Sequence, residues 1–325
     1  MSMNFWKKLP SQFLAIAPMS DVTDEPFREM FLRYGRPDVF WTEFISDQEL
    51  FSKGKDHCLK ETLRFGQGEH PIVAQVFGSN PSYFAKTAQI LKELGFDGID
   101  INMGCPNKDI EKKGGGAALM KNPGLAREII RAIKKTVPEF PISVKTRIGY
   151  GKNEVGEWLP NILEEGVAAV TVHLRTRKEL FHLPAHWELA PEILQLRDKY
   201  CPDTFLIGNG DIKSYAQAKE MAEESKFDGI MIGRGAVGNP WVFTGETPTT
   251  KQRLEVILAH TKAHCDFYGI TETNLRNFES VKKHLHAYCK GFFGAKELRD
   301  GLMRVKTPDD VEWLVKEFLG ERGVS

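Results

Sequence analysis

The sequence has few cysteines and no pattern among them. Its five cysteines are odd in number, and no two of them form a Cys-x-x-Cys pair. This argues against a disulfide-bonded scaffold and against a zinc site. We therefore expect a protein of the reducing cytoplasm that holds no metal.

Long apolar runs are lacking as well. No stretch approaches the roughly 18 residues that a membrane-spanning helix needs. Lys7 and Lys8 precede an apolar segment at 13–17, which has the outline of an export signal, but the segment is short and runs straight into Pro18. A core strand is the better interpretation, and no membrane partner is expected.

Net charge is the third feature that the sequence lacks. Its 44 basic residues balance 44 acidic ones, so the total charge indicates neither a nucleic acid nor a membrane surface as a partner. The balance is uneven along the chain, because residues 281–306 carry seven basic against two acidic side chains (net +5), whereas residues 307–325 carry two against five (net −3). The basic stretch is either a solvated helix face or a surface for phosphate groups. Histidine and aromatic side chains are interleaved in it: His284, His286, Tyr288, Phe292 and Phe293.

What is present is an alternation of short apolar runs and longer helical patterns. With 325 residues, the chain has room for two domains or for one barrel with an appendage. Eight strands are predicted, at 13–17, 39–42, 72–77, 98–101, 142–146, 169–173, 205–207 and 229–232. Several are apolar throughout, as is typical of strands buried on both faces. A (β/α)8 TIM barrel is predicted, and a doubly wound open sheet is the rival that periodicity does not exclude.

The pattern changes after Trp241. Residues 244–250 are small or helix-breaking and indicate a linker. Beyond them only helices are expected, at about 250–268, 274–291, 294–304 and 308–319. The predicted organisation is a barrel domain over 1–243, a linker over 244–250 and a small all-helical domain over 251–325.

Polar residues recur where the predicted strands end. In a barrel, catalytic groups gather at the C-terminal ends of the strands. Each residue alone has a structural explanation, but their recurrence favours one shared pocket. The candidates are Pro18, Met19, Ser20, Thr42, Glu43, Gln75, Asn102, Lys145, Arg147, His173, Arg175, Arg177, Asn209, Gly210, Asp211, Gly233 and Arg234.

The turns after the last two strands contain glycine. Backbone N–H groups in such turns can approach a phosphate closely, and Arg234 would add positive charge, so a phosphate-bearing ligand is predicted. The bland alternative is that these glycines only make tight turns. By contrast, Gly114-Gly115-Gly116 matches no dinucleotide-binding fingerprint and indicates a flexible loop or a close backbone approach.

Cys105 is the sharpest catalytic candidate. It lies between Gly104 and Pro106 on a predicted loop, where a buried structural cysteine would be out of place. A free thiol has a pKa near 8.5, so at neutral pH it is mostly protonated and can act as a general acid. As a nucleophile it would need a base such as His173.

Taken together, these residues resemble the tRNA-dihydrouridine synthases. The resemblance spans residues 13 to about 243. It rests on Ala17-Pro18-Met19, Thr42-Glu43, Asp100-Ile101-Asn102-Met103-Gly104-Cys105-Pro106, Val144-Lys145-Thr146-Arg147, Val172-His173, Arg175-Thr176-Arg177, Asn209-Gly210-Asp211 and Met231-Ile232-Gly233-Arg234-Gly235-Ala236. The Asn-Met-Gly-Cys-Pro segment is highly specific, whereas the glycine turns are shared with other flavin barrels.

The resemblance implies a barrel that holds FMN and a helical domain that helps to bind tRNA. NADPH or NADH would bind transiently and reduce the FMN. It implies a flavin site formed by Pro18, Met19, Ser20, Gln75, Lys145 and His173, and a phosphate site formed by Asn209, Gly210, Asp211, Gly233 and Arg234. Cys105 would be the proton donor, and Asn102, Arg147, Arg175 and Arg177 would face the uridine. From the basic stretch, we expect Lys282 and Lys283 to contact tRNA.

The sequence departs from the usual family pattern in one region. Leu174 replaces the glycine of His-Gly-Arg-Thr-Arg, and Phe181-His182-Leu183-Pro184 fills the loop beyond, on the side where uridine is recognised. Two alternatives stay open: an FMN-dependent dehydrogenase of a free pyrimidine, of the dihydroorotate or dihydropyrimidine type, and a flavin-free RNA-binding protein on a relic barrel. The added helical domain favours the tRNA enzyme, for which a monomer suffices.

Overall fold

The computed structural model describes residues 4–322 and divides into two compact units. The first contains residues up to 24, 37–212 and 216–233, and the second contains 25–36, 213–215 and everything from 234 onward. The C-terminal segment of the second unit therefore begins at residue 234, ten residues before the predicted linker. The unit also includes helix α1 (Glu25–Tyr34). The reason is packing, because the ring of Phe27 on α1 lies 5.1 Å from the ring of His284.

The first unit is built on eight parallel strands. They are β1 (Phe13–Ile16), β2 (Phe40–Ser46), β3 (Ile72–Phe77), β4 (Gly98–Asn102), β5 (Ile142–Arg147), β6 (Ala169–His173), β7 (Phe205–Asn209) and β8 (Gly229–Ile232). The sheet runs in the order β1-β8-β7-β6-β5-β4-β3-β2, and a bridge between Ala15 and Val39 joins its two end strands. This sequential, closed order confirms the predicted (β/α)8 barrel, since a doubly wound sheet would reverse its order midway.

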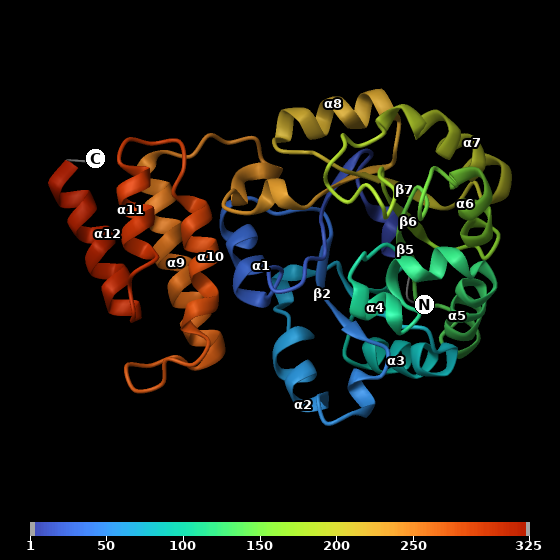
Figure 1. Cartoon of the computed structure of the whole chain (residues 1–325), viewed down its shortest axis with the longest axis horizontal. Coiled ribbons are helices and arrows are strands. Elements are labelled where there is room, and N and C mark those ends of the chain that lie inside the picture. Colours follow the sequence, from blue (N-terminus) through green and yellow to red (C-terminus); the bar gives the residue numbers. More distant parts are fainter. Residues whose placement is uncertain (1–3, 323–325) are drawn as a thin grey trace. The chain divides into compact units, whose positions relative to one another are not determined.

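Helices connect the parallel strands and lie outside them (Figure 1). They include α3 (Pro81–Glu93), α4 (Lys108–Lys112), α5 (Pro123–Thr136), α6 (Val155–Leu163), α7 (Ala190–Tyr200) and α8 (Tyr215–Ser225). Both α3 and α5 begin at an Asn-Pro pair: the side chains of Asn80 and Asn122 accept hydrogen bonds from first-turn N–H groups. Proline at the first helical position needs no hydrogen bond of its own, so these two starts are encoded locally.

The apolar core closes the N-terminal end of the barrel. A short 3₁₀ turn (Phe5–Lys8) places Trp6 there with 1% of its surface exposed. The ring of Trp6 lies 5.8 Å from that of Phe13 and 6.0 Å from that of Trp41. Segment 13–16 is thus a buried first strand, as the sequence predicted, and the polar strand ends are left to the opposite end of the barrel.

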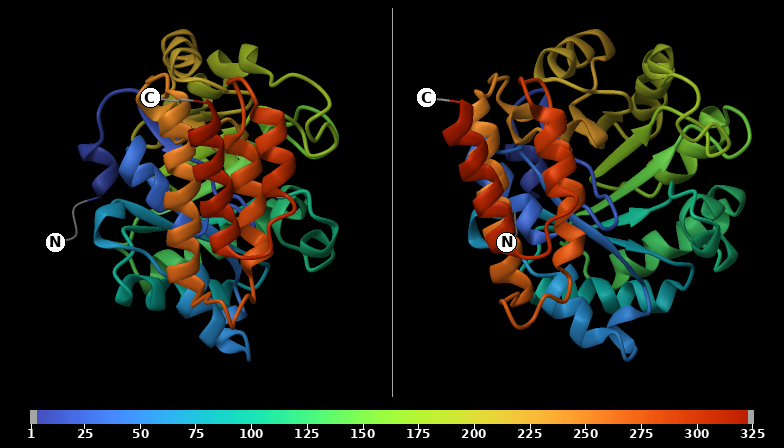
Figure 2. Two further views of the ribbon diagram at one scale, coloured as in Figure 1. Left: turned by 90° about the vertical axis from the view of Figure 1, so that its left-hand side faces the viewer. Right: turned by 60° about the vertical axis from the view of Figure 1, so that its left-hand side comes forward.

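The second unit consists of α1 and four further helices, α9 (Thr250–Tyr268), α10 (Phe278–Tyr288), α11 (Ala295–Leu302) and α12 (Pro308–Arg322), which run side by side in Figure 2. A capping box of Thr249 and Gln252 starts α9, and Gly269, in a left-handed conformation, ends it. Within the described residues, no helix is long and apolar enough to cross a membrane.

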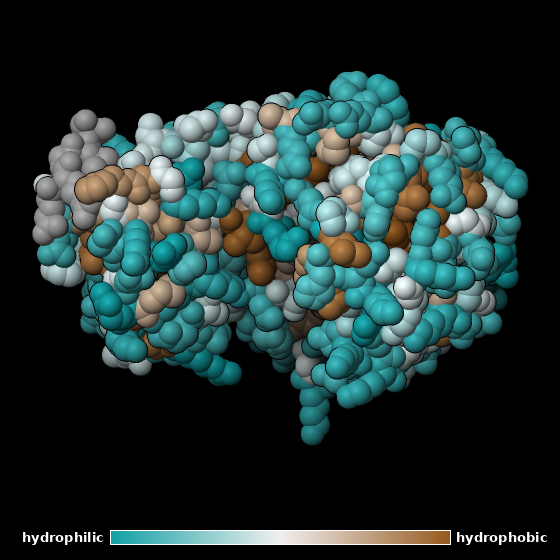
Figure 3. All heavy atoms as spheres, turned by 45° about the horizontal axis from the view of Figure 1, so that its top comes forward, coloured by the Kyte–Doolittle hydropathy of each residue, from teal (hydrophilic) through white to brown (hydrophobic). Residues whose placement is uncertain are grey.

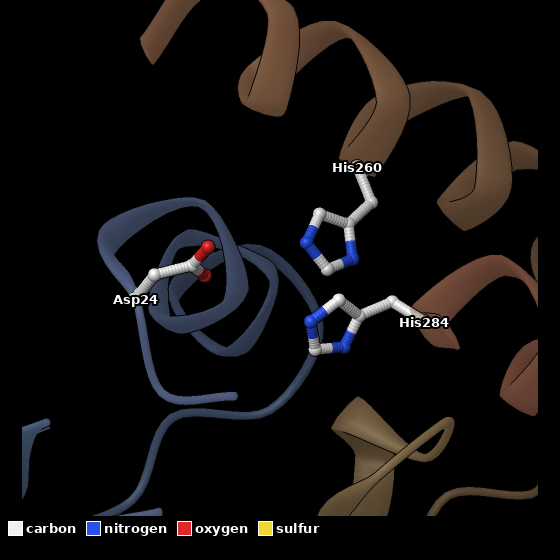
Figure 4. Close-up of side chains that lie close together, drawn as sticks. All are labelled: Asp24, His260 and His284. Atoms are coloured by element: carbon white, nitrogen blue, oxygen red, sulfur yellow. The ribbon is translucent and has the colours of Figure 1, made fainter. Parts of the chain in front are cut away.

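Two histidines face each other in the core of this unit (Figure 4). The rings of His260 on α9 and His284 on α10 lie 4.7 Å apart. Nδ1 of His260 lies 2.8 Å from the hydroxyl of Tyr288, but among the described residues no hydrogen-bond partner is found for its Nε2 or for either nitrogen of His284. Burial lowers the pKa of both rings, that of His284 to about 3, so both are neutral at pH 7.

Candidate active site

A cavity of about 230 Å³ opens at the C-terminal ends of the barrel strands. Its lining residues come from strands β2 to β6 and from the loops after β1, β4 and β6: Pro18, Phe44, Gln75, Asn102, Gly104, Cys105, Pro106, Lys145, Thr146, Arg147, His173 and Phe181. Seven of these are residues that the sequence singled out as candidates, so the structure brings the core of the predicted site together. Phe44 was not predicted to line it, whereas Phe181 belongs to the loop that the resemblance places on the uridine side.

Strand register places the polar side chains on successive levels inside the barrel. Gln75 on β3 pairs with Asp100 on β4, which pairs with Ser143 on β5. Two residues further along, Asn102 pairs with Lys145. Because alternate residues of a strand share a face, Asp100 and Asn102 point the same way, one level apart.

A chain of hydrogen bonds links these levels. Nε2 of Gln75 donates to Oδ2 of Asp100 at 2.6 Å, and Nδ2 of Asn102 donates to Oε1 of Gln75 at 2.8 Å. Ser143 donates its hydroxyl to the other oxygen of Asp100 at 2.6 Å. Asp100 was missed as a site residue, although a carboxylate inside an otherwise apolar strand is itself a signal. Burial raises the pKa of Asp100 to about 6.

The loop that carries Cys105 is held from three sides. Oδ1 of Asn102 accepts from the N–H groups of Gly104 at 3.2 Å and Cys105 at 2.9 Å. Nε of Arg147 donates to the carbonyl of Gly104 at 2.7 Å. On the third side Gly116, at φ +58°, comes so near that a Cβ would lie 2.8 Å from the Cys105 carbonyl oxygen. The glycine triplet is therefore a close-approach site, one of the two predicted options.

Electrostatics in the cavity favour a neutral thiol beside cationic groups. Burial raises the pKa of Cys105, so the thiol stays protonated at neutral pH. Burial, and to a lesser extent the charge of the nearby Arg147, lowers the pKa of Lys145 to about 8. The Nζ of Lys145 donates to Oδ1 of Asn209 at 3.2 Å. Burial also lowers the pKa of Arg147 to about 10. Both groups remain mostly charged at pH 7 and can stabilise a developing anion.

Arg175 and Arg177 lie after β6 and are tied to other loops. Arg175 is 2% exposed and forms an ion pair with Asp211, whose carboxylate also accepts from the N–H of Ala185 at 2.9 Å. Arg177 forms an ion pair with Glu111. The structure thus gives both guanidinium groups a role in linking loops, and their expected contact with uridine stays a prediction.

The residues predicted around the cofactor divide into two groups. Pro18, Gln75, Lys145 and His173 line the cavity, whereas Met19, Ser20 and Asn209 through Asp211 lie at strand ends beside it in the first unit. Gly210 has φ +143°, and a Cβ added to it would lie 2.6 Å from the Cβ of Ala185. Gly233 ends the first unit, and Arg234 opens the second as an exposed residue of a short 3₁₀ turn (Arg234–Ala236).

The basic stretch of the second unit is partly buried. Lys282 is 6% exposed, and its Nζ donates to Glu279 at 2.7 Å, whereas Lys283 beside it is exposed. The exposed basic residues of the stretch are Lys283, Lys290, Lys296, Arg304 and Lys306, of which Lys290 donates its Nζ to the carbonyl of Val237 at 3.3 Å. Phe292 packs with its ring 5.9 Å from that of Phe318, while Phe293 is 90% exposed. Such exposed apolar groups show between mostly hydrophilic residues on the face drawn in Figure 3.

A closed (β/α)8 barrel with a buried polar cavity at its C-terminal strand ends defines a class of barrel enzymes. Solved structures match this fold. A variant of NCR from Zymomonas mobilis is 16% identical with a TM-score of 0.52, covering 74% of this chain and 93% of that one. Histamine dehydrogenase from Rhizobium sp. 4-9 is 13% identical with a TM-score of 0.51, covering 77% and 48%. At these identities the likeness shows the fold alone.

Sequence comparison identifies the family. The family model "Dihydrouridine synthase (Dus)" matches residues 15–321. A probable tRNA-dihydrouridine synthase 2 of Bacillus subtilis (strain 168) is 42% identical over 98% of this chain and 97% of its own length. A probable tRNA-dihydrouridine synthase of Staphylococcus aureus (strain Mu50) is 40% identical over 98% and 96%. The chain belongs to the dihydrouridine synthase family, which confirms the resemblance seen in its motifs, and it is an enzyme.

Proposed function

We propose that this enzyme reduces the uracil C5–C6 double bond of uridines in tRNA, with FMN as bound cofactor and NADPH as reductant. The observation that carries the proposal is the Cys105 thiol, held in the cavity beside Lys145 and Arg147. A protonated acid next to two cations is the arrangement that reduction of a conjugated carbonyl compound needs. The family match and the names of the curated relatives support the substrate.

The residues present fit a flavin. The cavity wall offers side-chain donors from Gln75 and Lys145, the groups that would hold the polar edge of the flavin ring. The glycine turns after β7 and β8 would hold the phosphate, as the family resemblance implies; the missing side chain of Gly210 is itself explained by the close approach of Ala185. Bound and reduced, the cofactor would supply a hydride to the uracil carbon beta to a carbonyl.

The chain's own residues would then complete the reaction. As enolate character develops on the uracil, Lys145 and Arg147 stabilise the negative charge. Cys105 donates its proton to the carbon alpha to the carbonyl, a step that a positioned acid accelerates by about 10²–10⁴. Asn102, whose Nδ2 and Oδ1 are both engaged, seats the ring by shaping the cavity wall.

The helical unit would supply part of the tRNA contact. Its basic stretch leaves five exposed cationic side chains, a footprint suited to phosphate groups. A uridine in folded tRNA is stacked, so the base must leave its stack to reach a cavity of this size.

The test is a substrate comparison with the purified full-length enzyme. Transcribed tRNA, free uridine and orotate are each incubated with the enzyme, FMN and NADPH, and dihydro products are measured by mass spectrometry. We expect dihydrouridine in tRNA and at least about 100-fold less turnover of the free pyrimidines, because remote contacts contribute to transition-state binding. Turnover of orotate at the same rate as tRNA, or no product from tRNA, would contradict the proposal.

A further inference from the structure

Asp100 is a buried carboxylate to which the reaction assigns no part. It is the third residue of β4, is 0% exposed, and lies between Ile99 and Ile101, which are equally buried. Burying a carboxylate in a barrel core is unfavourable unless it is fully hydrogen-bonded. Both oxygens of Asp100 are bonded, one to Gln75 and one to Ser143.

The hydrogen bonds that connect Asp100 to the backbone of Cys105 all run in the same donor-to-acceptor direction. An ionised carboxylate only accepts, so Gln75 must turn its Nε2 toward Asp100 and its Oε1 toward Asn102. Asn102 must then present Nδ2 to Gln75, which leaves Oδ1 to accept from the backbone of Gly104 and Cys105. The ionised carboxylate at one end and the two backbone N–H groups at the other thus set the same orientation for two side-chain amides in series.

Without the Asp100 acceptor Gln75 loses its preferred orientation, and only the two backbone N–H groups still hold Asn102 in place. Each amide can rotate by 180° at little steric expense, because its oxygen and nitrogen have nearly the same size. The reversed Asn102 would place a donor against the N–H groups of Gly104 and Cys105. Those groups would lose their acceptor, and the loop would shift away from Asn102.

We propose that Asp100 is a positioning residue for the proton donor, acting through Gln75 and Asn102 to hold the Cys105 thiol in place. This inference rests on the proposed role of Cys105 as the acid. Asp100 is not a lining residue of the cavity and has no hydrogen bond to the thiol. Its effect is transmitted by three consecutive hydrogen bonds of 2.6, 2.8 and 2.9 Å.

The first test compares two substitutions at the same site. Asp100→Asn can still accept from Gln75 while its amide donates to the Ser143 hydroxyl, so the direction of the chain survives. Asp100→Leu removes the acceptor at similar volume. We expect kcat on tRNA to fall roughly 10–100-fold in Asp100→Leu with KM changed by less than about threefold, because misplacement of a catalytic group by about 1 Å has effects of this size. Asp100→Asn should retain kcat within about fivefold, and equal losses in the two variants would overturn the proposal.

The second test asks whether the effect passes through Asn102. In an Asn102→Ala background, Asp100→Leu should change kcat by less than about twofold, since a residue acting only through another loses its effect when that residue is gone. The same fold loss in both backgrounds would overturn the proposal. Should Asp100→Leu fail to fold, the Asp100→Asn/Ser143→Ala pair replaces it, because removing the hydroxyl frees the asparagine to reverse.

A readout independent of turnover is the alkylation of Cys105. Iodoacetamide labelling, followed peptide by peptide across pH, reports the exposure and pKa of this one thiol. We expect Asp100→Leu to change the Cys105 rate at least about threefold while leaving Cys201 unchanged; equal rates would count against the proposal. If Cys105→Ala kept full activity, the acid assignment would fail. If it were inactive while Asp100→Leu kept normal kcat and labelling, only the positioning role would fail.

Discussion

The barrel cavity and the core of the helical unit both bury polar side chains, but they satisfy them differently. In the cavity, Gln75 and Asn102 are hydrogen-bonded through both atoms of their amides. In the helical core, neither nitrogen of His284 has a hydrogen-bond partner among the described residues. Gln75 and Asn102 are therefore held in one orientation, whereas His284 serves as a neutral packing group.

The pKa values follow the same division. Burial brings the pKa of Asp100 up to about 6 and that of Lys145 down to about 8, so both lie close to neutral pH. Burial takes the pKa of His284 down to about 3, far from the working range. Groups with pKa values near the operating pH are typical of catalytic sites, and groups driven out of that range are typical of a core. Four comparisons between the two regions test this contrast: two cysteines, two glycines, the response to acid, and two lysines.

The largest effect is expected from a comparison of two cysteines, Cys105 in the cavity and Cys289 in the helical core. Cys105→Ala should lower kcat on tRNA by about 10²–10⁴ while flavin content and Tm stay unchanged, because it removes only the acid. Cys289, which is 2% exposed in the helical unit, is the matched control. Cys289→Ala should keep kcat but lower the free energy of unfolding by about 1 kcal/mol. Normal turnover in Cys105→Ala would refute the assigned acid.

Two left-handed glycines give the next contrast. At Gly116, a new Cβ would collide with the Cys105 carbonyl, whereas at Gly291, at φ +78° in the helical unit, none of the described residues other than its chain neighbours has an atom within 4 Å of the new Cβ. Gly116→Ala should therefore displace the loop and lower kcat roughly 10–100-fold. Gly291→Ala should only destabilise the fold, by about 1–2 kcal/mol, measured by denaturant unfolding. Equal kcat in the two variants would contradict the close-approach role.

Acid should weaken the helical unit as the pH falls below 6.5. The folded-state pKa of His284 lies below the unfolded value of 6.5, so its contribution to stability is complete above pH 6.5 and is lost as pH falls toward 3. The loss is about 1.4 kcal/mol for each pH unit in that range. Hydrogen exchange of α9 and α10 between pH 7 and 4 would measure it.

A substitution at the same helix sharpens this prediction. His284→Leu should reduce the pH dependence by one proton, because the buried titrating group is gone. His286→Gln, on the exposed side of α10, should leave it unchanged. An identical pH profile for wild type and His284→Leu would show that the ring does not control acid unfolding.

The smallest effect concerns two adjacent lysines. Lys283→Glu should weaken tRNA binding severalfold and reduce the slope of log Kd against log salt by about 1, without changing flavin content. Lys282→Glu should instead destabilise the helical unit, because Lys282 is buried against Glu279. Lys316→Glu, in the net-negative segment 307–325, is the control for the change in total charge. Unchanged tRNA affinity in Lys283→Glu would count against this surface.

Much of the barrel could be predicted from the sequence, because its strands are buried on both faces. Strands β3, β6 and β8 begin and end where the apolar runs predicted. The cavity residues Gln75, Asn102, Lys145 and His173 could be predicted too, since the C-terminal ends of parallel strands meet at one end of a barrel. Asp100 could not be assigned in this way, because its importance lies in neighbours on other strands.

By itself, the sequence predicted most of the strands and helices and the proton-donor candidate, since these depend on local patterns of polarity and on a short motif; it left a barrel and a doubly wound sheet both open, and the strand order decided between them. Only the tertiary structure decided that α1 belongs to the helical unit, that Arg175 pairs with Asp211, and which of two adjacent lysines reaches solvent. Such facts depend on contacts between residues far apart in the chain. On a helix, neighbours point about 100° apart, so Lys282 packs inward and Lys283 faces water although the sequence gives them equal charge.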